Sequence, residues 1–330
     1  MNENIVILGG GYAGAMAAAR MARRGVPVTL IDAKDALVER IRLHQVIAGD
    51  DVPPVPYARL FRSLPVRFIR ARATALDRAR KRVITTEGEI AYDKLVYAIG
   101  SANDLNDPFT IRRRLHDAKR ATIVGAGLTG IELTSELAER HPHLRLTLID
   151  AGTLGRDLSA KAATHLRDWM REHGVRVVEN TRVTTLDDDV VIWCNAFHLS
   201  PIARDAGLHV NERGQIIVDE HLRSSDPSIY AIGDAAISGT RRMSCAVALP
   251  MGTYVADLLT GATSDPFRFA FLIRCISLGR KDGIIQFVNA DDSPREKCLT
   301  GRPAAWIKEL ICRYTITSLR LQSRGFQEAA

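Results

Sequence analysis

Two glycine-rich loops of the form G-x-G-x-x-G are the segments of this sequence best suited to chemistry. They span Gly9–Gly14 and Gly125–Gly130, and the acids Asp32 and Asp150 follow them, each closing a copy of the string Thr-Leu-Ile-Asp. In such a loop the first glycine makes a tight turn, the second lets the backbone approach a pyrophosphate, and the third lets helix and strand pack closely. The acid accepts hydrogen bonds from ribose hydroxyls. One loop alone could be an ordinary turn, but two complete units predict two bound dinucleotides.

The residues around each loop predict the elements that would position it. The first unit is predicted as a strand over Ile5–Leu8, a helix over Ala13–Arg24 and a strand over Val28–Asp32. The second is predicted as a strand over Thr122–Val124, a helix over Gly130–Arg140 and a strand over Leu144–Asp150. Strand, tight loop, helix and strand form a βαβ unit. The fold class is therefore α/β, with two Rossmann-like dinucleotide-binding domains.

A third acid, Asp234, follows Gly233 at the end of the apolar run Ile229–Ala231. An acid there could bond a ribityl hydroxyl of a flavin held by the first loop, or it could be a turn acid or helix cap. The segment from Leu249 to Gly252 is predicted to lead into a helix ending at Leu259. The positive end of that helix could stabilise charge developing on a flavin ring.

The second acid, Asp150, bears on the choice of nicotinamide cofactor. A carboxylate at this strand end welcomes a ribose 2′-hydroxyl and repels a 2′-phosphate, which favours NADH over NADPH. Arg145 and Arg156 weaken that preference, because either could reach a phosphate.

The remaining segments are less regular. Val66–Ile69, Ala73–Asp77 and Arg82–Thr86 are predicted as short antiparallel strands. Towards the end of the chain, two β-like runs cover Phe269–Ser277 and Gly283–Val288, and a last helix begins at Pro303. We expect these parts to support the two nucleotide-binding units.

The last helix has apolar residues at helical spacing and basic residues beside them. The apolar set is Trp306, Ile307, Leu310, Ile311 and Tyr314, and the basic set is Lys308, Arg313, Arg320 and Arg324. Such a helix can lie on an anionic membrane surface. The alternatives are a helix docked on the protein itself or a contact in a homodimer.

The overall composition excludes some classes of protein. The net charge is +7, with basic stretches over residues 67–82 and 112–114. Few aromatic residues interleave with them, so we interpret them as solvated faces and not as a nucleic-acid site. The five cysteines form no C-x-x-C motif or zinc cluster, and this odd number with no signal peptide fits a reducing cytoplasm. No apolar run is long enough to span a membrane.

Four motifs together resemble a known family. They are the loop Gly9–Gly14 with Asp32, the segment Tyr92–Ser101, the loop Gly125–Gly130 with Glu132, and the segment Ile229–Ala236, and the region Cys275–Gly283 is similar as well. The chain resembles the two-dinucleotide flavoproteins of the pyridine nucleotide-disulfide oxidoreductase superfamily. Within it, the chain looks most like type II NADH:quinone oxidoreductase-like proteins, some of which use their tails on membranes.

The resemblance implies FAD on the first unit, NAD(P)H on the second, and electron transfer to a quinone or another small aromatic acceptor. Glu132 would lie where nicotinamide meets flavin and is the candidate catalytic residue, although it could be a helix-surface acid. The expected cofactor-binding residues are Gly9, Gly11, Tyr12, Ala13, Gly14, Asp32, Ala33, Arg42, His44, Ala73, Ala98, Gly100, Gly233, Asp234, Leu249, Gly125, Gly127, Gly130 and Asp150. No metal is expected.

The resemblance also implies the domain boundaries. Residues 1–104 and 213–265 would form the FAD-binding domain, with a shortened NAD(P)-binding-like domain inserted at 105–212. Residues 266–330 would form a C-terminal β-hairpin and amphipathic helix.

The sequence departs from the family in five places. The redox cysteine pair of the disulfide reductases is missing after the first unit, which argues against dithiol chemistry. The segment Ser244–Pro250 lacks the glutamines usual in quinone reductases. The spans 100–121 and 183–190 are short, and Cys194–Phe197 stands where a strand-end glycine is expected. Two alternatives therefore stay open: an FAD-dependent tailoring enzyme that does not use nicotinamide, and a flavin-binding redox sensor that is not an enzyme.

Overall fold

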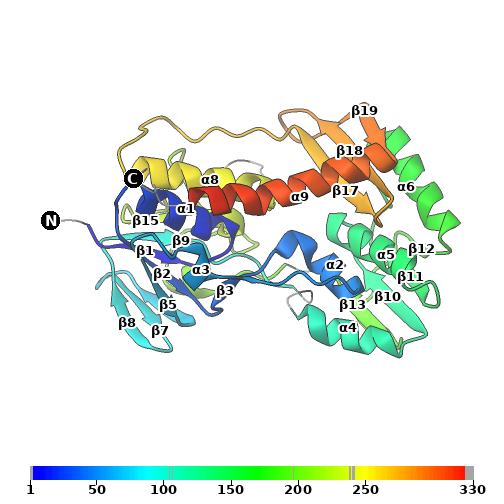
Figure 1. Ribbon diagram of the computed structural model, residues 1–330, viewed down its shortest axis with the longest axis horizontal. Coiled ribbons are helices and arrows are strands. Elements are labelled where there is room, and N and C mark those ends of the chain that lie inside the picture. The colour runs from blue at the N-terminus through cyan, green and yellow to red at the C-terminus, as the bar shows by residue number, and fades with distance from the viewer. Residues whose placement is uncertain are drawn as a thin grey trace, which may run out of the picture.

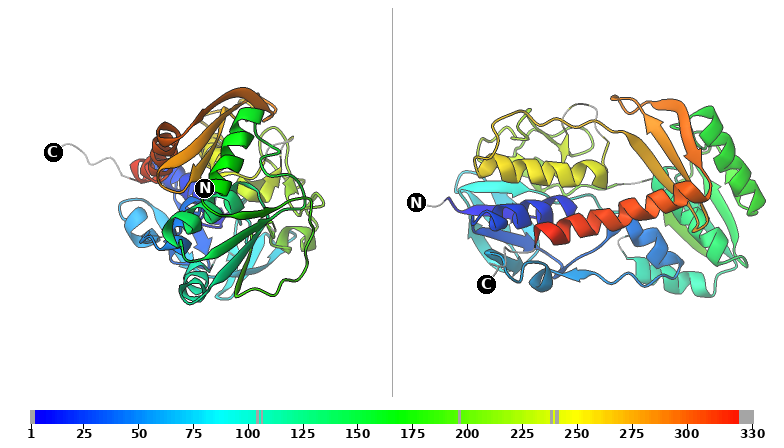
Figure 2. Two further views of the ribbon diagram at one scale, coloured as in Figure 1. Left: turned by 90° about the vertical axis from the view of Figure 1, so that its right-hand side faces the viewer. Right: turned by 45° about the horizontal axis from the view of Figure 1, so that its top comes forward.

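The computed structural model describes residues 3–103, 105, 107–195, 197–237, 239 and 242–323. Two lobes lie side by side along the longest axis, and the long helix α9 (Arg302–Gln322) runs across both of them (Figure 1). The second view in Figure 2 shows the same helix bridging the lobes from another direction. The tail prediction that included Arg324 falls partly outside the described residues.

The first lobe is built on a five-stranded parallel sheet in the order β15-β9-β1-β2-β5. Its strands are β1 (Ile5–Leu8), β2 (Val28–Asp32), β5 (Val66–Arg70), β9 (Lys94–Tyr97) and β15 (Ile229–Ala231). The central strand β1 is wholly apolar and buried, and its neighbour β9 is so after Lys94, as strands covered on both faces should be. The prediction of an antiparallel strand over Val66–Ile69 is wrong in direction, because β5 pairs parallel with β2. A short apolar run indicates burial but not the direction of its neighbour.

Helices α1 (Tyr12–Arg23) and α8 (Cys245–Leu259) pack closely against each other in this lobe (Figure 1). The contact needs small residues, since a Cβ on Gly252 would overlap the carbonyl oxygen of Ala13. The predicted end of α8 is confirmed, but its start is four residues earlier than Leu249. Pro250 therefore lies inside the helix and not at its first turn.

An antiparallel sheet of three short strands extends the first lobe. It consists of β6 (Ala73–Asp77), β7 (Arg82–Thr85) and β8 (Gly88–Ala91), of which the last was not predicted. The smaller elements in the first lobe and its connections are β3 (Ala36–Leu37), η1 (Arg40–Arg42), β4 (Val55–Pro56), α3 (Tyr57–Leu60), α7 (Ile202–Asp205), β14 (Ile216–Ile217), η3 (Gly233–Ala235) and β16 (Ala236–Ile237). Helix α2 (Leu43–Ala48) leaves this lobe and packs against α4 (Pro108–His116) and α5 (Leu128–Arg140) of the second (Figure 1).

The second lobe repeats the βαβ plan around a four-stranded parallel sheet in the order β12-β11-β10-β13. Its strands are β10 (Arg120–Val124), β11 (Arg145–Ile149), β12 (Arg176–Val178) and β13 (Val190–Trp193), and its helices are α4 (Pro108–His116), α5 (Leu128–Arg140) and α6 (Ala160–Glu172). No strand lies between residues 179 and 189, all of which are described. The connection from β12 to β13 is therefore irregular.

The C-terminal region is a three-stranded antiparallel sheet with α9 packed on it. Its strands are β17 (Ile273–Leu278), β18 (Asp282–Val288) and β19 (Pro294–Thr300). The predicted hairpin is present, but β19 was missed because its residues are mostly polar and half-buried or exposed. Helix α9 begins at Arg302, one residue before the predicted start.

Candidate functional site

The first glycine loop connects β1 to α1 and has the geometry of a phosphate-binding turn. Gly9 has φ +106°, and a Cβ there would crowd the carbonyl oxygen of Ala98 after β9. A Cβ on Gly14 would overlap the carbonyl oxygen of Gly9, whereas a Cβ on Gly11 would have no atom within 4 Å. The outer two glycines thus hold the turn together, and the middle one faces open space.

The second loop repeats this geometry between β10 and α5. Gly125 has φ +109°, a Cβ on Gly130 would overlap the oxygen of Gly125, and a Cβ on Gly127 would again meet nothing within 4 Å. Asn195 packs against Gly125 much as Ala98 packs against Gly9, so the turn after β13 closes without the expected glycine. Ala196, in the same unusual turn, lies outside the described residues.

The two strand-end acids brace their loops in the same way. Asp32 accepts hydrogen bonds from the amides of Gly10 at 2.6 Å and Lys34 at 2.8 Å. Asp150 accepts from the amides of Ala126 and Gly152, both at 2.7 Å.

The Arg156 guanidinium also donates to Asp150 at 2.7 Å. Burial raises the pKa of Asp150, but the two amides and the guanidinium outweigh it and leave this pKa below its usual value. The carboxylate is therefore ionised and fixed at the mouth of the second loop.

Asp234 is brought to the carboxyl edge of the first sheet, as predicted. Its Oδ2 accepts a hydrogen bond of 2.7 Å from the Ser101 hydroxyl and lies 3.9 Å from where a Cβ on Gly100 would stand. The side chain of Arg40, in η1, donates a hydrogen bond to the carbonyl oxygen of Ser101. Arg40 and Ser101 were not among the predicted site residues. Ser101 closes the segment Tyr92–Ser101 that carries the family resemblance, but that motif gave no role to its hydroxyl, and Arg40 belongs to no recognisable motif.

The other predicted FAD-binding residues lie around the same edge. Ala33 follows Asp32, Ala98 is buried after β9, Ala73 begins β6, and Leu249 is half-buried on α8. Gly233 has φ +68°, which suits the turn before Asp234.

The two loops fit dinucleotides. Their middle glycines leave open space beside the backbone, and no side chain caps α1 or α5, so the positive ends of both helices face that space. Tyr12, in the first turn of α1, has a buried hydroxyl without a hydrogen-bond partner among the described residues. Such an orphaned group suits a polar ligand.

Glu132 is the predicted catalytic residue, and its surroundings were not predictable. It is buried in the first part of α5, and its Oε1 lies 2.9 Å from Nζ of Lys308 on α9. The same oxygen accepts a hydrogen bond of 3.0 Å from the amide of Ser277 on β17. Lys308 was interpreted as a surface residue of a basic helix, but its side chain is only 11% exposed.

Glu132 and Lys308 each stabilise the charged form of the other. Burial raises the pKa of Glu132, but the Lys308 ammonium and the other contacts outweigh it and hold the pKa below its usual value. Burial lowers the pKa of Lys308, but the Glu132 carboxylate raises it well above its usual value. Both side chains are therefore charged at neutral pH.

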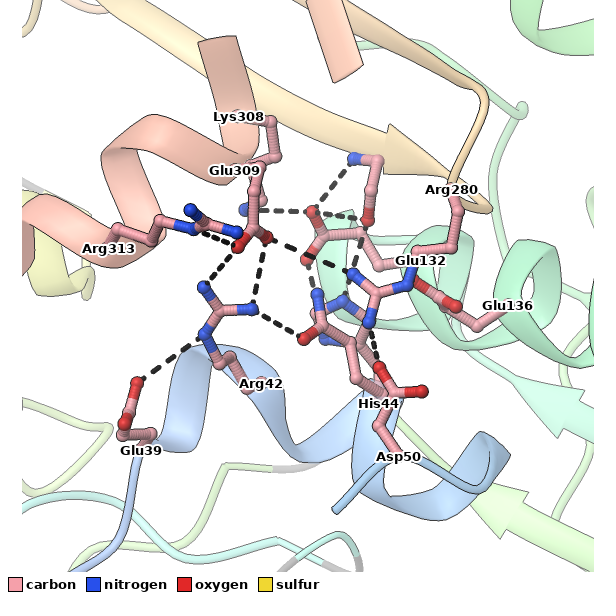
Figure 3. A network of polar contacts seen from close by, with 12 residues as sticks. Glu39, Arg42, His44, Asp50, Glu132, Glu136, Arg280, Lys308, Glu309 and Arg313 are labelled. Atoms are coloured by element: carbon pink, nitrogen blue, oxygen red, sulfur yellow. Dashed lines mark hydrogen bonds and ion pairs between the residues drawn. The ribbon is translucent and has the colours of Figure 1, made fainter. Parts of the chain in front are cut away.

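His44 and Arg42, also predicted to bind cofactor, lie on the other side of Glu132 (Figure 3). His44 Nδ1 is 3.9 Å from Glu132 Oε2, and burial lowers its pKa to about 4, so His44 is neutral at pH 7. Arg42 forms a two-pronged pair with Glu309 of α9 at 2.9 and 3.0 Å. Arg42 therefore ties α9 to the segment of η1 and α2.

The cysteines form no disulfide among the described residues. All five are free and lie within the described residues. Burial raises the pKa of Cys245 to about 12 and that of Cys312 to about 11, so both stay protonated and unreactive. Among the described residues, no cluster could hold a metal ion and no helix could cross a membrane.

Two open glycine loops on neighbouring βαβ units, with an acid bracing each loop from the end of the second strand, define a two-dinucleotide oxidoreductase. Comparison with known proteins agrees. Residues 3–252 match the model of the pyridine nucleotide-disulphide oxidoreductase family, and the chain belongs to that family. It is an FAD-dependent oxidoreductase that uses a nicotinamide nucleotide.

Three similar proteins illustrate the range of this family. Ferroptosis suppressor protein 1 of Xenopus tropicalis is 23% identical over 86% of this chain and 88% of its own length. The NADH dehydrogenase-like protein YutJ of Bacillus subtilis is 25% identical over 71% of this chain and 77% of its own. The structure of NDH2 from Plasmodium falciparum in complex with NADH superposes with a TM-score of 0.80 at 13% identity, covering 99% of each chain.

Proposed function

We propose that this oxidoreductase passes reducing equivalents from NADH to a quinone or another small aromatic acceptor. FAD would be held by the first loop, Asp32 and Asp234, and NADH by the second loop and Asp150. When bound, these cofactors supply the hydride chemistry, while the protein supplies orientation and electrostatics. The two middle glycines, Gly11 and Gly127, would lie against the two pyrophosphates.

The observation that carries this proposal is the buried pair of Glu132 and Lys308. Glu132 lies two residues beyond the second glycine loop, and Lys308 reaches it from a helix that also packs on α1. The Lys308 ammonium group has three N–H donors, so its hydrogen bond to Glu132 leaves two donors for another ligand. A quinone oxygen gains negative charge as it is reduced, and a fixed cation in a site without water stabilises that charge.

The preference for NADH is part of the proposal. The Asp150 carboxylate is held by two backbone amides, so it cannot easily turn away from a 2′-phosphate. Arg156 is neutralised by Asp150 and half-exposed, which leaves it a weaker phosphate partner than a free arginine.

The alternative in which the second unit is only a lid is less well supported. Its loop repeats the left-handed first glycine, the open middle glycine and the braced acid of the first unit. A lid would need none of these three features.

Steady-state turnover with a panel of acceptors tests the proposal. NADH oxidation is followed under anaerobic conditions with a soluble benzoquinone, a naphthoquinone and ferricyanide. We expect quinone turnover on the order of 1–10³ s⁻¹, and we expect Lys308→Met to lose quinone turnover while keeping ferricyanide turnover. NADH oxidation with ferricyanide alone would refute the quinone as acceptor.

The exposed face of α9 supports contact with a membrane surface, where quinones are dissolved. Trp306 is 66% exposed, Tyr314 is 70% exposed, and Leu310 lies between them on the same face. Arg313 and Arg320 are exposed on the same helix. The opposite face docks on the protein, so the docked-helix prediction describes one side of α9 and the membrane proposal concerns the other.

Co-sedimentation with phospholipid vesicles tests this contact. The wild-type protein should sediment with vesicles that contain anionic lipid, and the variant with Trp306→Ser and Tyr314→Ser should stay in solution. Phe109→Ser, which removes an aromatic residue of similar exposure (59%) from α4, is the control. Equal sedimentation of all three proteins would contradict the proposal.

A further inference from the structure

Glu136 is a buried carboxyl group that the site described above does not use. Its side chain has no exposed surface, and neither carboxyl oxygen has a hydrogen-bond partner among the described residues. Its nearest charged partner is Arg280, whose Nε lies 3.5 Å from Oε1 (Figure 3). Leaving a buried carboxylate without hydrogen bonds is costly, whereas a protonated carboxyl group is not charged.

Glu136 lies one helical turn beyond Glu132, so the two carboxyl groups share a face of α5. Other titratable and charged groups face Glu136 from its own helix and from the segments packed against it. They are Glu139 and Arg140 of α5, Arg280 of the β17–β18 turn, Glu309 of α9, His44 of α2, and Asp50 just after α2. Burial is the largest influence, and together with the Glu139 carboxylate it raises the pKa of Glu136 to about 7. The group therefore titrates near neutral pH.

The structure connects Glu136 to solvent on one side. Arg280 and Arg140 both form ion pairs with Asp50, and Arg140 is 41% exposed. On the other side of Glu136 lies Glu132, with Lys308 bound to it and His44 beside it. A chain of polar groups thus leads from the surface to the buried Glu132–Lys308 pair, which we call the junction.

The reaction proposed above needs such a chain. In NADH + H⁺ + quinone → NAD⁺ + quinol, the hydride brings two electrons and one of the two protons that the quinol gains. The second proton comes from solvent, and the junction around Glu132 is buried. A group that already holds a proton inside the protein would deliver it without opening the site to water.

We propose that Glu136 holds this second proton and passes it towards Lys308 and the acceptor, by way of Glu132 and His44. The O–H bond of Glu136 breaks, an O–H bond forms on the quinol, and a solvent proton restores Glu136 beside Asp50 and Arg280. This inference rests on the proposed quinone reaction. Glu136 acts through other residues and touches no substrate.

The first test compares two oxidants. Protein reduced anaerobically with NADH is mixed rapidly with a soluble benzoquinone, which takes up protons, or with ferricyanide, which takes up none. In Glu136→Gln the quinone step should slow on the order of a hundredfold at pH 7 and lose its pH dependence. Reduction by NADH and oxidation by ferricyanide should stay unchanged.

Two further variants separate proton delivery from packing. Glu136→Asp keeps a carboxyl group and should restore the pH dependence, while Glu172→Gln makes the same chemical change at an exposed site on α6 and should have no effect. A wild-type rate and pH profile in Glu136→Gln would overturn the proposal.

The second test needs no quinone. Infrared spectra of the purified protein with its cofactor should contain a protonated carboxyl band that disappears with a midpoint at about pH 7 and is missing in Glu136→Gln. The absence of this band from the wild-type protein would overturn the role of Glu136. If the band is present but wild-type protein does not reduce quinone, the acceptor is wrong and Glu136 has no quinone to protonate, which overturns the delivery step as well.

Discussion

Lys308 Nζ and Glu132 Oε1 lie 2.9 Å apart, and both side chains are about nine-tenths buried. The two residues come from α9 and α5, which are far apart in the sequence. Their contact joins the C-terminal helix to the second nucleotide-binding unit. It also places a fixed cation at the predicted meeting point of two cofactors.

Removing only one member of the Glu132–Lys308 pair should destabilise the protein. Lys308→Met leaves the Glu132 carboxylate buried without its cation, which we expect to lower the free energy of unfolding by about 3–5 kcal/mol. Denaturant unfolding of the purified protein measures this change. The double variant Glu132→Leu with Lys308→Met removes both charges and should recover most of the loss. Losses that simply add in the double variant would show that the pair is not coupled.

Substitution of the middle glycine of each loop should weaken cofactor binding without impairing folding. At Gly11 and Gly127 a Cβ would meet nothing in the protein, and both backbones have φ values that alanine adopts readily. Gly11→Ala should therefore fold normally but lose FAD and its yellow colour. Gly127→Ala should stay yellow but bind NADH weakly.

Gly14→Ala is the contrasting variant, because its Cβ would overlap the Gly9 carbonyl oxygen. It should lose stability even without cofactor, by about 3 kcal/mol or more, as overpacking does. Thermal unfolding of the FAD-free proteins measures the difference. Equal stability of the Gly11 and Gly14 variants would contradict the assignment of their two roles.

Asp150 should set the discrimination between NADH and NADPH. Asp150→Ala removes an ionised hydrogen-bond acceptor, which we expect to cost about 1.5–3 kcal/mol of NADH binding while NADPH binding improves or stays constant. The ratio of kcat/KM for the two nucleotides measures this directly. Asp32→Ala, the matched change in the first unit, should weaken FAD retention but leave that ratio unaltered.

His44 should make stability fall in acid. Its folded-state pKa is lowered from 6.5 to about 4, so the unfolded chain binds a proton more readily between these values. Stability is complete above pH 6.5 and is lost as the pH falls towards 4, by about 3 kcal/mol from this residue. Unfolding free energies measured from pH 7 to pH 4 should show this slope, and His44→Gln should flatten it. An unchanged slope in the variant would show that other groups cause the loss.

The sequence was most informative where the chemistry is local. Gly9, Gly11 and Asp32 lie within one βαβ unit, so their spacing alone predicted a loop that the structure confirms. The repeat around Gly125 was equally readable. The parallel pairing of β5 and the start of α8 were not, because an apolar run or a proline constrains its own backbone and not its neighbours.

The junction was the least predictable part. Glu132 was found only through family resemblance, and Lys308 was interpreted as an exposed basic residue because its neighbours in sequence are amphipathic. Its burial depends on α9 docking against β17 and α1, which no local pattern contains. A lysine between two apolar residues on the docked face of a helix is the signal that could have indicated it.

The most direct test of the central claim is rapid anaerobic mixing of the yellow protein with NADH. If the two loops hold FAD and NADH with their reactive rings together, the flavin absorbance should bleach in a single phase. NADH deuterated at the transferred position should bleach it more slowly. A flavin spectrum that does not change with either NADH or NADPH would contradict the account.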